Sequence, residues 1–191
     1  MDSKLKETLV IDDIVPSDRQ NEFLQNILKA PWYFLNDMSY NNSKHPSYGF
    51  TSVFKDPFKG VVSPFYELVS VPIINALIEK ENLEINDIYF NRAFIQVPLA
   101  ENFHKGTNGV HVDLPKEHIA CVYYVNDADG DTVIYEQNII DTPTGTDNVT
   151  LVEHARVTPK KGRLVMFDGR RYHCSSQPKN GYRCIINFDL I

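Results

Sequence analysis

The sequence is poor in cysteine, and its few thiols form no recognisable pattern. Its 191 residues include three cysteines, Cys121, Cys174 and Cys184, and no C-x-x-C pair. An odd number without paired spacing argues against a disulfide framework and against a zinc ribbon. We therefore interpret the three thiols as small core residues of a protein in a reducing compartment.

The sequence also lacks an excess of positive charge and any long hydrophobic run. Nineteen Lys and Arg stand against 25 Asp and Glu, which gives a formal net charge of −6. A nucleic-acid-binding protein needs a basic face for phosphates, so nucleic acid is disfavoured as a partner or substrate. The sequence contains no run of 18 apolar residues, so it predicts no membrane span. Acidic residues occur too early in the N-terminus for a signal peptide. These features predict a soluble, cytoplasmic protein.

The length suits one domain over residues 1–191, whose N-terminal part, 1–85, has helical and loop signals. Ser17 and Gln20 have the spacing of a capping box at the start of a helix over 18–30, with apolar residues at helical spacing behind them. Pro31 would end that helix. We expect this part of the chain to pack as a buttress against a sheet.

A second helix is predicted to begin at Ser63-Pro64, where serine supplies an N-cap and proline suits the first turn. Pro72 removes a donor from the helical ladder, so we expect a kink or two shorter helices there. The aromatic segment from Trp32 to Gly60 reads as loop, and its large side chains as core or as a flap.

Residues 86–191 are typical of strands. Segments rich in β-branched and aromatic residues alternate with clusters of Gly, Pro, Asn and Asp. No helical pattern separates them, so the sequence predicts an antiparallel barrel or sandwich and a mainly β fold with N-terminal helices. The predicted strands are IYFNRAFIQV, IACVYYV, DTVIYE, NVTLVEHARV, RLVMF and YRCIINFDLI.

Three side chains form the candidate metal site. His111 and Asp113 are two residues apart, so on an extended segment they point to the same side, and His173 can reach them from a neighbouring strand. Two histidines and one carboxylate on one face of an octahedron are the ligand set of non-haem Fe(II) oxygenases. H-x-D alone is a weak signal, since a surface pair is the alternative.

Arg183 is the second chemical signal. In YRCIINFDLI, alternation places Arg183, Ile185 and Asn187 on one face of the strand. A guanidinium in so apolar a strand is costly to bury without an anion, and a dicarboxylic cosubstrate would supply one. The alternatives are an edge strand that reaches solvent or a pairing with a protein carboxylate such as Asp189.

The C-terminal half resembles the 2-oxoglutarate/Fe(II)-dependent dioxygenase superfamily, and within it the prolyl 4-hydroxylase-like branch. The resemblance covers roughly residues 90–191, and the first ninety residues contribute no motif. It implies a double-stranded β-helix, or jelly-roll, core. The matching segments, in family order, are HVDLP, CVYYVND, GDT, VTPKKGRLVMFDGRRYHCS and GYRCIINFDL.

The resemblance implies roles residue by residue. It makes His111, Asp113 and His173 the iron ligands and Arg183 the partner of the distal carboxylate of 2-oxoglutarate. Tyr124 matches a cosubstrate-contacting tyrosine, with a plain core tyrosine as the alternative. Asn187, on the Arg183 face, is a further candidate contact with that carboxylate.

The sequence departs from the family pattern in two places. A second tyrosine is common on the strand before H-x-D, but here that strand reads AFIQVPLAEN, and Gln96 is the candidate replacement. The usual G-G-x-T reads Asp129-Gly130-Asp131-Thr132. These changes concern the cosubstrate pocket.

The remaining histidines and two arginines have weaker claims. His45, His104, His118 and His154 are interpreted as surface or structural residues, with His104 as the nearest rival in the site. Arg170 and Arg171 precede His173 and are candidate contacts for an acidic substrate group, with a solvated pair as the alternative.

The resemblance implies hydroxylation of a C–H bond, with conversion of 2-oxoglutarate and O₂ to succinate and CO₂. The cofactors expected are Fe(II), 2-oxoglutarate as cosubstrate, O₂, and ascorbate as a candidate reductant. The substrate class is a peptidyl residue such as proline, or a small molecule. The alternative is a non-catalytic, cupin-like jelly-roll module that binds a metal or a sugar without turnover.

Overall fold

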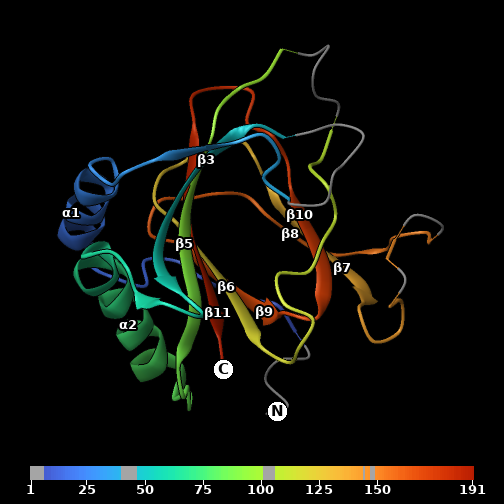
Figure 1. Ribbon diagram of the computed structural model, residues 1–191, viewed down its shortest axis with the longest axis horizontal. Helices are drawn as coiled ribbons and strands as arrows, with labels where there is room; N and C mark the ends of the chain where they lie inside the picture. Colours follow the sequence, from blue (N-terminus) through green and yellow to red (C-terminus); the bar gives the residue numbers. More distant parts are fainter. Residues whose placement is uncertain (1–6, 40–46, 101–105, 144, 147–148) are drawn as a thin grey trace.

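The computed structural model describes residues 7–39, 47–100, 106–143, 145–146 and 149–191. Two antiparallel sheets face each other, and two helices cover the outer side of the larger sheet (Figure 1). The mainly β prediction with N-terminal helices is therefore confirmed. No helix among the described residues is long and apolar enough to cross a membrane.

The larger sheet has the order β1-β9-β6-β11-β5-β3-β2, and β4 pairs with β3. All of its pairings are antiparallel. Its strands are β1 (Leu9–Ile11), β2 (Tyr33–Leu35), β3 (Gly49–Asp56), β4 (Gly60–Val61), β5 (Ile88–Gln96), β6 (Ile119–Tyr124), β9 (Leu164–Asp168) and β11 (Arg183–Leu190).

The smaller sheet has the order β10-β7-β8 and lies on the side opposite the helices (Figure 1). Its strands are β7 (Thr132–Asn138), β8 (Glu153–Val157) and β10 (Arg171–Ser175). Strand β10 is missing from the predicted strand segments, although His173 was expected on a strand beside His111. The segment RYHCS is short, follows a tight turn and carries three polar residues, Arg171, His173 and Ser175.

Four strands, β1 to β4, lie in residues 1–85, so the prediction of helices and loops alone for that part is wrong. Strand β3 falls inside the aromatic segment that we read as loop, and it pairs with β5 along its length. β-branched and aromatic residues in GFTSVFKD suit a pleated surface, and pairing with a central strand outweighs the weak local signal.

Helix α1 (Ser17–Ile27) ends three residues earlier than predicted and has no capping box. Pro16 occupies the N-cap and makes no side-chain cap hydrogen bond. Gln20 is buried and donates its amide to the carbonyl of Val15 and to Asp13 instead. The side chain therefore ties the helix to the segment before it.

The second helical region is divided as predicted. A π-helical turn, η2 (Tyr66–Ser70), precedes α2 (Val71–Glu81), and Pro72 lies in the first turn of α2, where a missing N–H costs no ladder bond. Asn82 ends the helix in the left-handed conformation, with φ of 49°.

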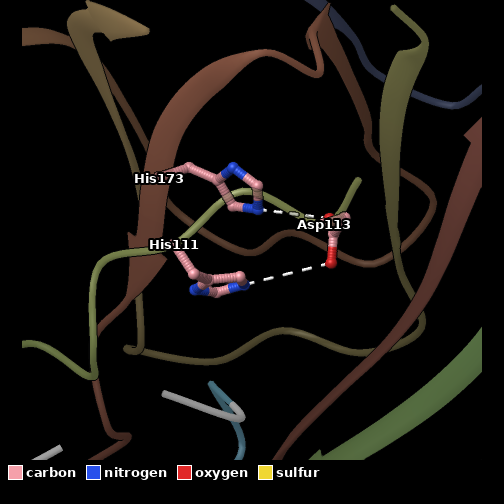
Figure 2. A group of neighbouring side chains, drawn as sticks. All are labelled: His111, Asp113 and His173. Carbon is pink, nitrogen blue, oxygen red and sulfur yellow. Dashed lines mark ion pairs between the residues drawn. The ribbon is translucent and has the colours of Figure 1, made fainter. Parts of the chain in front are cut away.

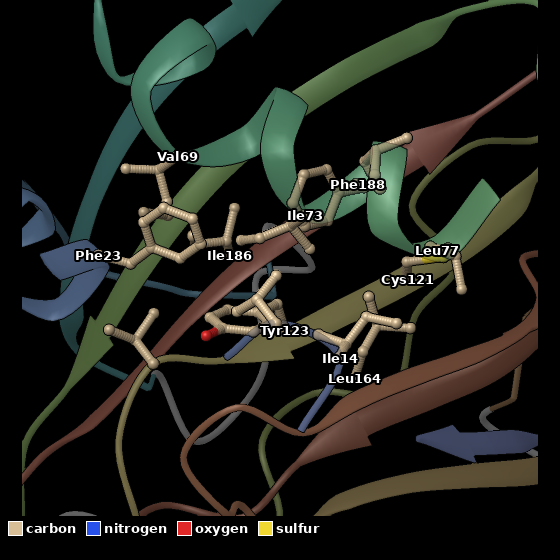
Figure 3. Packing of buried hydrophobic residues seen from close by; sticks show 14 of the residues in the cluster. Ile14, Phe23, Val69, Ile73, Leu77, Cys121, Tyr123, Leu164, Ile186 and Phe188 are labelled. Atoms are coloured by element: carbon tan, nitrogen blue, oxygen red, sulfur yellow. The ribbon is translucent and has the colours of Figure 1, made fainter. Parts of the chain in front are cut away.

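Alternation along the strands of the larger sheet separates two apolar layers. Ile186 and Phe188 of β11 face the helices, where they join residues such as Phe23 and Leu77 (Figure 3). Cys184 belongs to the same cluster. The opposite face of β11 carries Arg183, Ile185 and Asn187, as predicted, and Ile185 belongs to the cluster between the two sheets. All three cysteines are free and buried, which agrees with their interpretation as core residues.

Candidate functional site

The three candidate metal ligands converge between the two sheets. His173 lies on β10, and His111 lies on the segment beside it, since the two residues exchange both backbone hydrogen bonds at 2.9 and 3.0 Å. Asp113 follows two residues later and faces both imidazoles (Figure 2). One nitrogen or oxygen atom from each residue lies within 4.8 Å of the others.

Each imidazole is oriented by its other nitrogen. Nδ1 of His111 donates to the carbonyl of Gly109 at 2.9 Å, and Nδ1 of His173 donates to that of Arg171 at 3.1 Å. This leaves both Nε2 atoms facing Asp113, at 3.9 Å from Oδ1 for His111 and 3.2 Å from Oδ2 for His173. Such backbone anchoring is typical of metal-binding histidines.

Burial and mutual charge set the protonation of these groups. Burial, followed by repulsion from His173, lowers the pKa of His111 to about 4. Burial also disfavours the charged form of His173, but the hydrogen bond and attraction from Asp113 outweigh it and raise that pKa. Burial disfavours the carboxylate of Asp113, yet the hydrogen bond from His173 and the charge of Arg92 hold its pKa well below the usual range.

Two further residues hold the carboxylate of Asp113. Arg92 Nη2 donates to Oδ1 at 2.8 Å, and Asn187 Nδ2 donates to Oδ2 at 3.2 Å. Arg92 on β5 and Asn187 on β11 are cross-strand partners, so their side chains share the inner face. Asn187 thus contacts a candidate metal ligand and also lines the pocket that contains Arg183. Its predicted contact with a cosubstrate carboxylate stays a prediction.

Arg92 belongs to a buried polar cluster that sequence reasoning missed. Its Nη2 also lies 3.6 Å from Oδ2 of Asp189, and Oδ1 of Asp189 lies 3.7 Å from Nε2 of His118. Burial, followed by repulsion from Asp113, raises the pKa of Asp189 to about 8. A sequence signal was available, because Arg92, like Arg183, lies in a strand segment made mostly of apolar residues, although Asn91 precedes it.

Arg183 is buried among neutral partners. Nε donates to the carbonyl of Gly130 at 2.8 Å, Nη1 to Gln96 Oε1 at 2.8 Å, and Nη2 to Thr132 Oγ1 at 2.9 Å. Among the described residues, no carboxylate lies within 4.0 Å of this guanidinium, so the alternative pairing with Asp189 is wrong. Burial lowers its pKa, which reflects an incompletely compensated charge.

Gln96 and Tyr124 take different positions around Arg183. Gln96 faces Arg183 across the β5–β11 pair and lines the pocket described below. The hydroxyl of Tyr124 donates to Thr132 Oγ1 at 2.7 Å, and the ring of Tyr124 lies outside the pocket wall formed by described residues. The guanidinium of Arg183 also lies over this ring, with Cζ 5.7 Å from the ring centroid. The predicted role of Tyr124 as a direct cosubstrate contact stays a prediction.

One pocket of about 580 Å³, counted with its open mouth, joins the triad to Arg183. Its wall also contains residues that were not predicted, among them Thr132, Asn108 and Ser175. Asn108 donates to Ser175 Oγ at 2.8 Å, and Gln96 donates to the same hydroxyl at 3.2 Å. A continuous polar wall therefore runs from the segment before His111 to the guanidinium.

Arg170 and Arg171 do not line the described part of this pocket. Arg170 forms a two-pronged pair with Asp168, and Arg171 lies 3.1 Å from Glu136. Each arginine already has a protein carboxylate as its partner, Asp168 for Arg170 and Glu136 for Arg171. This placement does not favour their predicted contact with a substrate.

The other histidines fall into three groups. His154 pairs with Glu136 away from the pocket, as expected for a surface residue. His118 is buried and lies against Asp189, so of the two interpretations, surface or structural, it fits the structural one. His45 and His104 lie outside the described residues.

The donor set fits a divalent transition metal. Two anchored imidazole nitrogens and one carboxylate suit Fe(II) and related ions, and they occupy one side only, which leaves the pocket side for further ligands. The metal-binding role of the triad stays a prediction.

Sequence comparison finds no match, either to a protein-family model or to a curated protein. Solved structures, however, share the fold. The non-haem alpha-ketoglutarate-dependent epimerase SnoN from nogalamycin biosynthesis has a TM-score of 0.68 and 10% identity, covering 96% of this chain and 78% of that chain. SnoN is also known in complex with Fe³⁺, alpha ketoglutarate and nogalamycin RO.

Two oxygenases give the same result. A 2OG-Fe(II) oxygenase family oxidoreductase from Burkholderia pseudomallei has a TM-score of 0.68 and 9% identity, covering 98% of this chain and 86% of that one. A Pseudomonas putida prolyl-4-hydroxylase has a TM-score of 0.59 and 15% identity, covering 96% and 91%. The chain thus has the jelly-roll fold of 2-oxoglutarate/Fe(II) oxygenases, prolyl hydroxylases included, and the predicted fold resemblance is confirmed.

Proposed function

We propose that this protein is an Fe(II)- and 2-oxoglutarate-dependent dioxygenase that hydroxylates a C–H bond of a peptidyl residue, such as proline, or of a small molecule. The observation that carries the proposal is one pocket that contains both the His111–Asp113–His173 triad and the buried guanidinium of Arg183. The fold shared with iron- and oxoacid-dependent enzymes supports it.

The triad residues would hold the metal, and bound Fe(II) would supply the oxidative chemistry that couples 2-oxoglutarate and O₂ to succinate, CO₂ and the oxidised substrate. The protein's own contribution is orientation. His111 and His173 present Nε2 because their Nδ1 protons are committed to backbone carbonyls. The pocket walls limit the access of bulk water, since the side chains of Asp113 and His173 are each 8% exposed and that of His111 is 23% exposed.

Arg183 separates this proposal from a simple metal-binding module. A buried guanidinium surrounded by an amide, a hydroxyl and a carbonyl retains its positive charge without a protein counter-ion. A carboxylate that enters the pocket would satisfy it with charge-assisted hydrogen bonds. A module that binds only a metal has no use for such a cation.

The proposed substrate class is suggested by the structural neighbours and not by a residue of this chain. A prolyl-4-hydroxylase and an enzyme bound to nogalamycin RO share the fold, so a peptidyl and a small-molecule substrate are both consistent with it. Epimerisation, the reaction in the name of SnoN, is the second candidate reaction.

Anaerobic titration of the protein with Fe(II) and 2-oxoglutarate tests the proposal. We expect a visible metal-to-ligand charge-transfer band, and succinate on admission of air. His111→Ala should abolish the band, whereas His154→Ala, a histidine outside the pocket, should retain it. A protein that binds Fe(II) but shows neither band nor succinate would be the cupin-like binding module instead.

A screen of substrate-stimulated succinate release then identifies the substrate class. Proline-containing peptides and small metabolites are compared at equal concentration. Stimulation by the peptides only would assign a peptidyl substrate. If the product has inverted configuration and no added oxygen, the reaction is epimerisation and not hydroxylation.

A further inference from the structure

We propose that Arg92 is the positioning residue for the carboxylate of Asp113, and that Asp189, Phe90 and Phe94 hold Arg92 for that task. The inference rests on the proposed function, because Asp113 is a metal ligand only within it. Neither the comparisons nor the sequence motifs assign a role to Arg92.

The guanidinium of Arg92 is immobilised from several sides. Its side chain is 7% exposed. Its Cζ lies 4.1 Å from the ring centroid of Phe90 and 5.3 Å from that of Phe94, the neighbours two residues before and after it on the same face of β5. Cation–π contacts of this kind strengthen when the cation is desolvated.

The same guanidinium lies between two carboxyl groups. Nη2 donates to Asp113 Oδ1 at 2.8 Å and lies 3.6 Å from Asp189 Oδ2. Both carboxyl oxygens of Asp189 are buried and accept no hydrogen bond from the described residues. A buried carboxyl group without hydrogen bonds is energetically costly. Among the described residues, the basic side chains within ion-pair distance of Asp189 are Arg92 and His118.

Arg92 and Asn187 together fix the plane of the Asp113 carboxylate. Each residue holds one of its two oxygens, and the pair is in register across β5 and β11. Partners of this kind orient metal-binding groups, and their loss typically weakens metal binding by about 10–100-fold. Arg92 also adds one positive charge beside the Asp113 carboxylate, close to the metal position.

Binding of Mn²⁺ to the full chain, measured by isothermal titration calorimetry, tests the inference without turnover. We expect Arg92→Met to weaken Mn²⁺ binding by about 10–100-fold. Arg92→Lys should remain weakened by at least about five-fold, because an ammonium lacks the planar fork and stacks poorly between rings. Arg19→Met is the matched control, since Arg19 also pairs with a carboxylate, Glu22, and lies over an aromatic ring, Phe23, but on helix α1.

Phe90→Leu provides a second measurement that keeps every charge in place. It should give the Arg92 guanidinium more freedom to move and weaken Mn²⁺ binding a few-fold. It replaces the Arg92 variants as the test if those do not fold. Circular dichroism and the melting temperature of each variant show whether it is folded.

Three results would overturn the inference. Wild-type affinity in folded Arg92→Met, or in Phe90→Leu if Arg92→Met does not fold, would make Arg92 a purely structural residue. Mn²⁺ affinity in Arg92→Lys equal to that of the wild type would mean that a positive charge alone, without the planar guanidinium, is enough for metal binding. A wild-type protein that binds no Mn²⁺, or a His111→Ala variant that binds it normally, would instead reject the proposed metal site, and the inference with it.

Discussion

Gln96 meets Arg183 across two paired strands, and its Oε1 accepts a hydrogen bond from Nη1 of the arginine at 2.8 Å. A neutral amide in this position leaves the guanidinium charge available to an incoming anion. A carboxylate in the same position would neutralise it from within the protein.

Gln96→Glu should therefore block cosubstrate binding. The new carboxylate is nearly the same size as the amide and would form a buried ion pair with Arg183. We expect the dissociation constant of 2-oxoglutarate to rise by at least about ten-fold, which corresponds to about 1.4 kcal/mol. Equilibrium binding to the Fe(II)-loaded protein under anaerobic conditions measures it.

Gln96→Leu is the control for this substitution, because it removes the hydrogen bond without adding charge. It should weaken 2-oxoglutarate binding less than Gln96→Glu does. Equal effects of the two variants would show that the amide contact, and not the uncompensated charge of Arg183, governs affinity.

Gly130→Ala should disturb the same guanidinium by crowding. A Cβ at Gly130 would lie 2.6 Å from the carbonyl oxygen of Ser176 and 3.0 Å from Cδ of Arg183. The backbone carbonyl of Gly130 also accepts from Arg183 Nε, so any shift of the turn moves this acceptor. We expect about ten-fold weaker 2-oxoglutarate binding by the same titration.

Gly60→Ala is the comparison for Gly130→Ala. Gly60 has a φ of 76° and no heavy atom within 4 Å of an added Cβ. The substitution should lower stability through backbone strain and leave 2-oxoglutarate binding unchanged. Unchanged binding in Gly130→Ala as well would mean that the turn relaxes away from Arg183.

The sequence was informative where the signal is local. The two-residue spacing of His111 and Asp113 and the alternation around Arg183 follow from extended backbone alone, and the structure places all three along one pocket. Arg92 and Asn187 required knowledge of which residues face each other across β5 and β11. Register is set by the packed sheet, so a single strand does not reveal it.

The N-terminal strands were missed for a related reason. Strand β3 is an eight-residue segment that pairs with β5 from Gly49 to Lys55, and its sequence alternates only weakly between apolar and polar residues. The predicted capping box at Ser17 does not form, because Gln20 donates its side-chain amide to the carbonyl of Val15 and to the carboxylate of Asp13 before the helix. In both cases tertiary contacts outweighed a local preference.

Gly169→Ala should destabilise the fold strongly. A Cβ at Gly169 would lie 2.1 Å from Nε2, 2.3 Å from Cδ2 and 2.4 Å from Cε1 of the His118 ring. Overpacking of this kind typically costs about 1–3 kcal/mol. Urea unfolding of the two proteins measures the difference in the free energy of unfolding.

The double variant Gly169→Ala/His118→Ala separates crowding from other effects. Removal of the ring makes room for the new methyl group, so the double variant should be more stable than the sum of the two single effects predicts. Strict additivity would show that the ring and the glycine do not compete for the same space.

Asp12→Asn should remove a pH-dependent contribution to stability. Asp12 follows β1 and accepts hydrogen bonds from Arg163 at 2.6 Å and from Lys160 at 3.0 Å. These bonds, Arg163 first, lower its pKa from 3.8 to about 2. The unfolded chain therefore binds more protons than the folded one in that window, so the stabilisation is complete above about pH 4 and is lost as the pH falls to about 2.

The side chain of Asp12 is 41% exposed, so the stabilisation at neutral pH should be only about 1 kcal/mol or less. Urea unfolding at several pH values should show the variant less stable at pH 7 and the difference vanishing toward pH 2. Salt at about 1 M should also shrink it, because the cluster is accessible to solvent ions. Glu84→Gln, which removes a carboxylate outside this cluster, is the control. A difference that persists unchanged at low pH and high salt would mean that Asp12 acts through its shape and not through its charge.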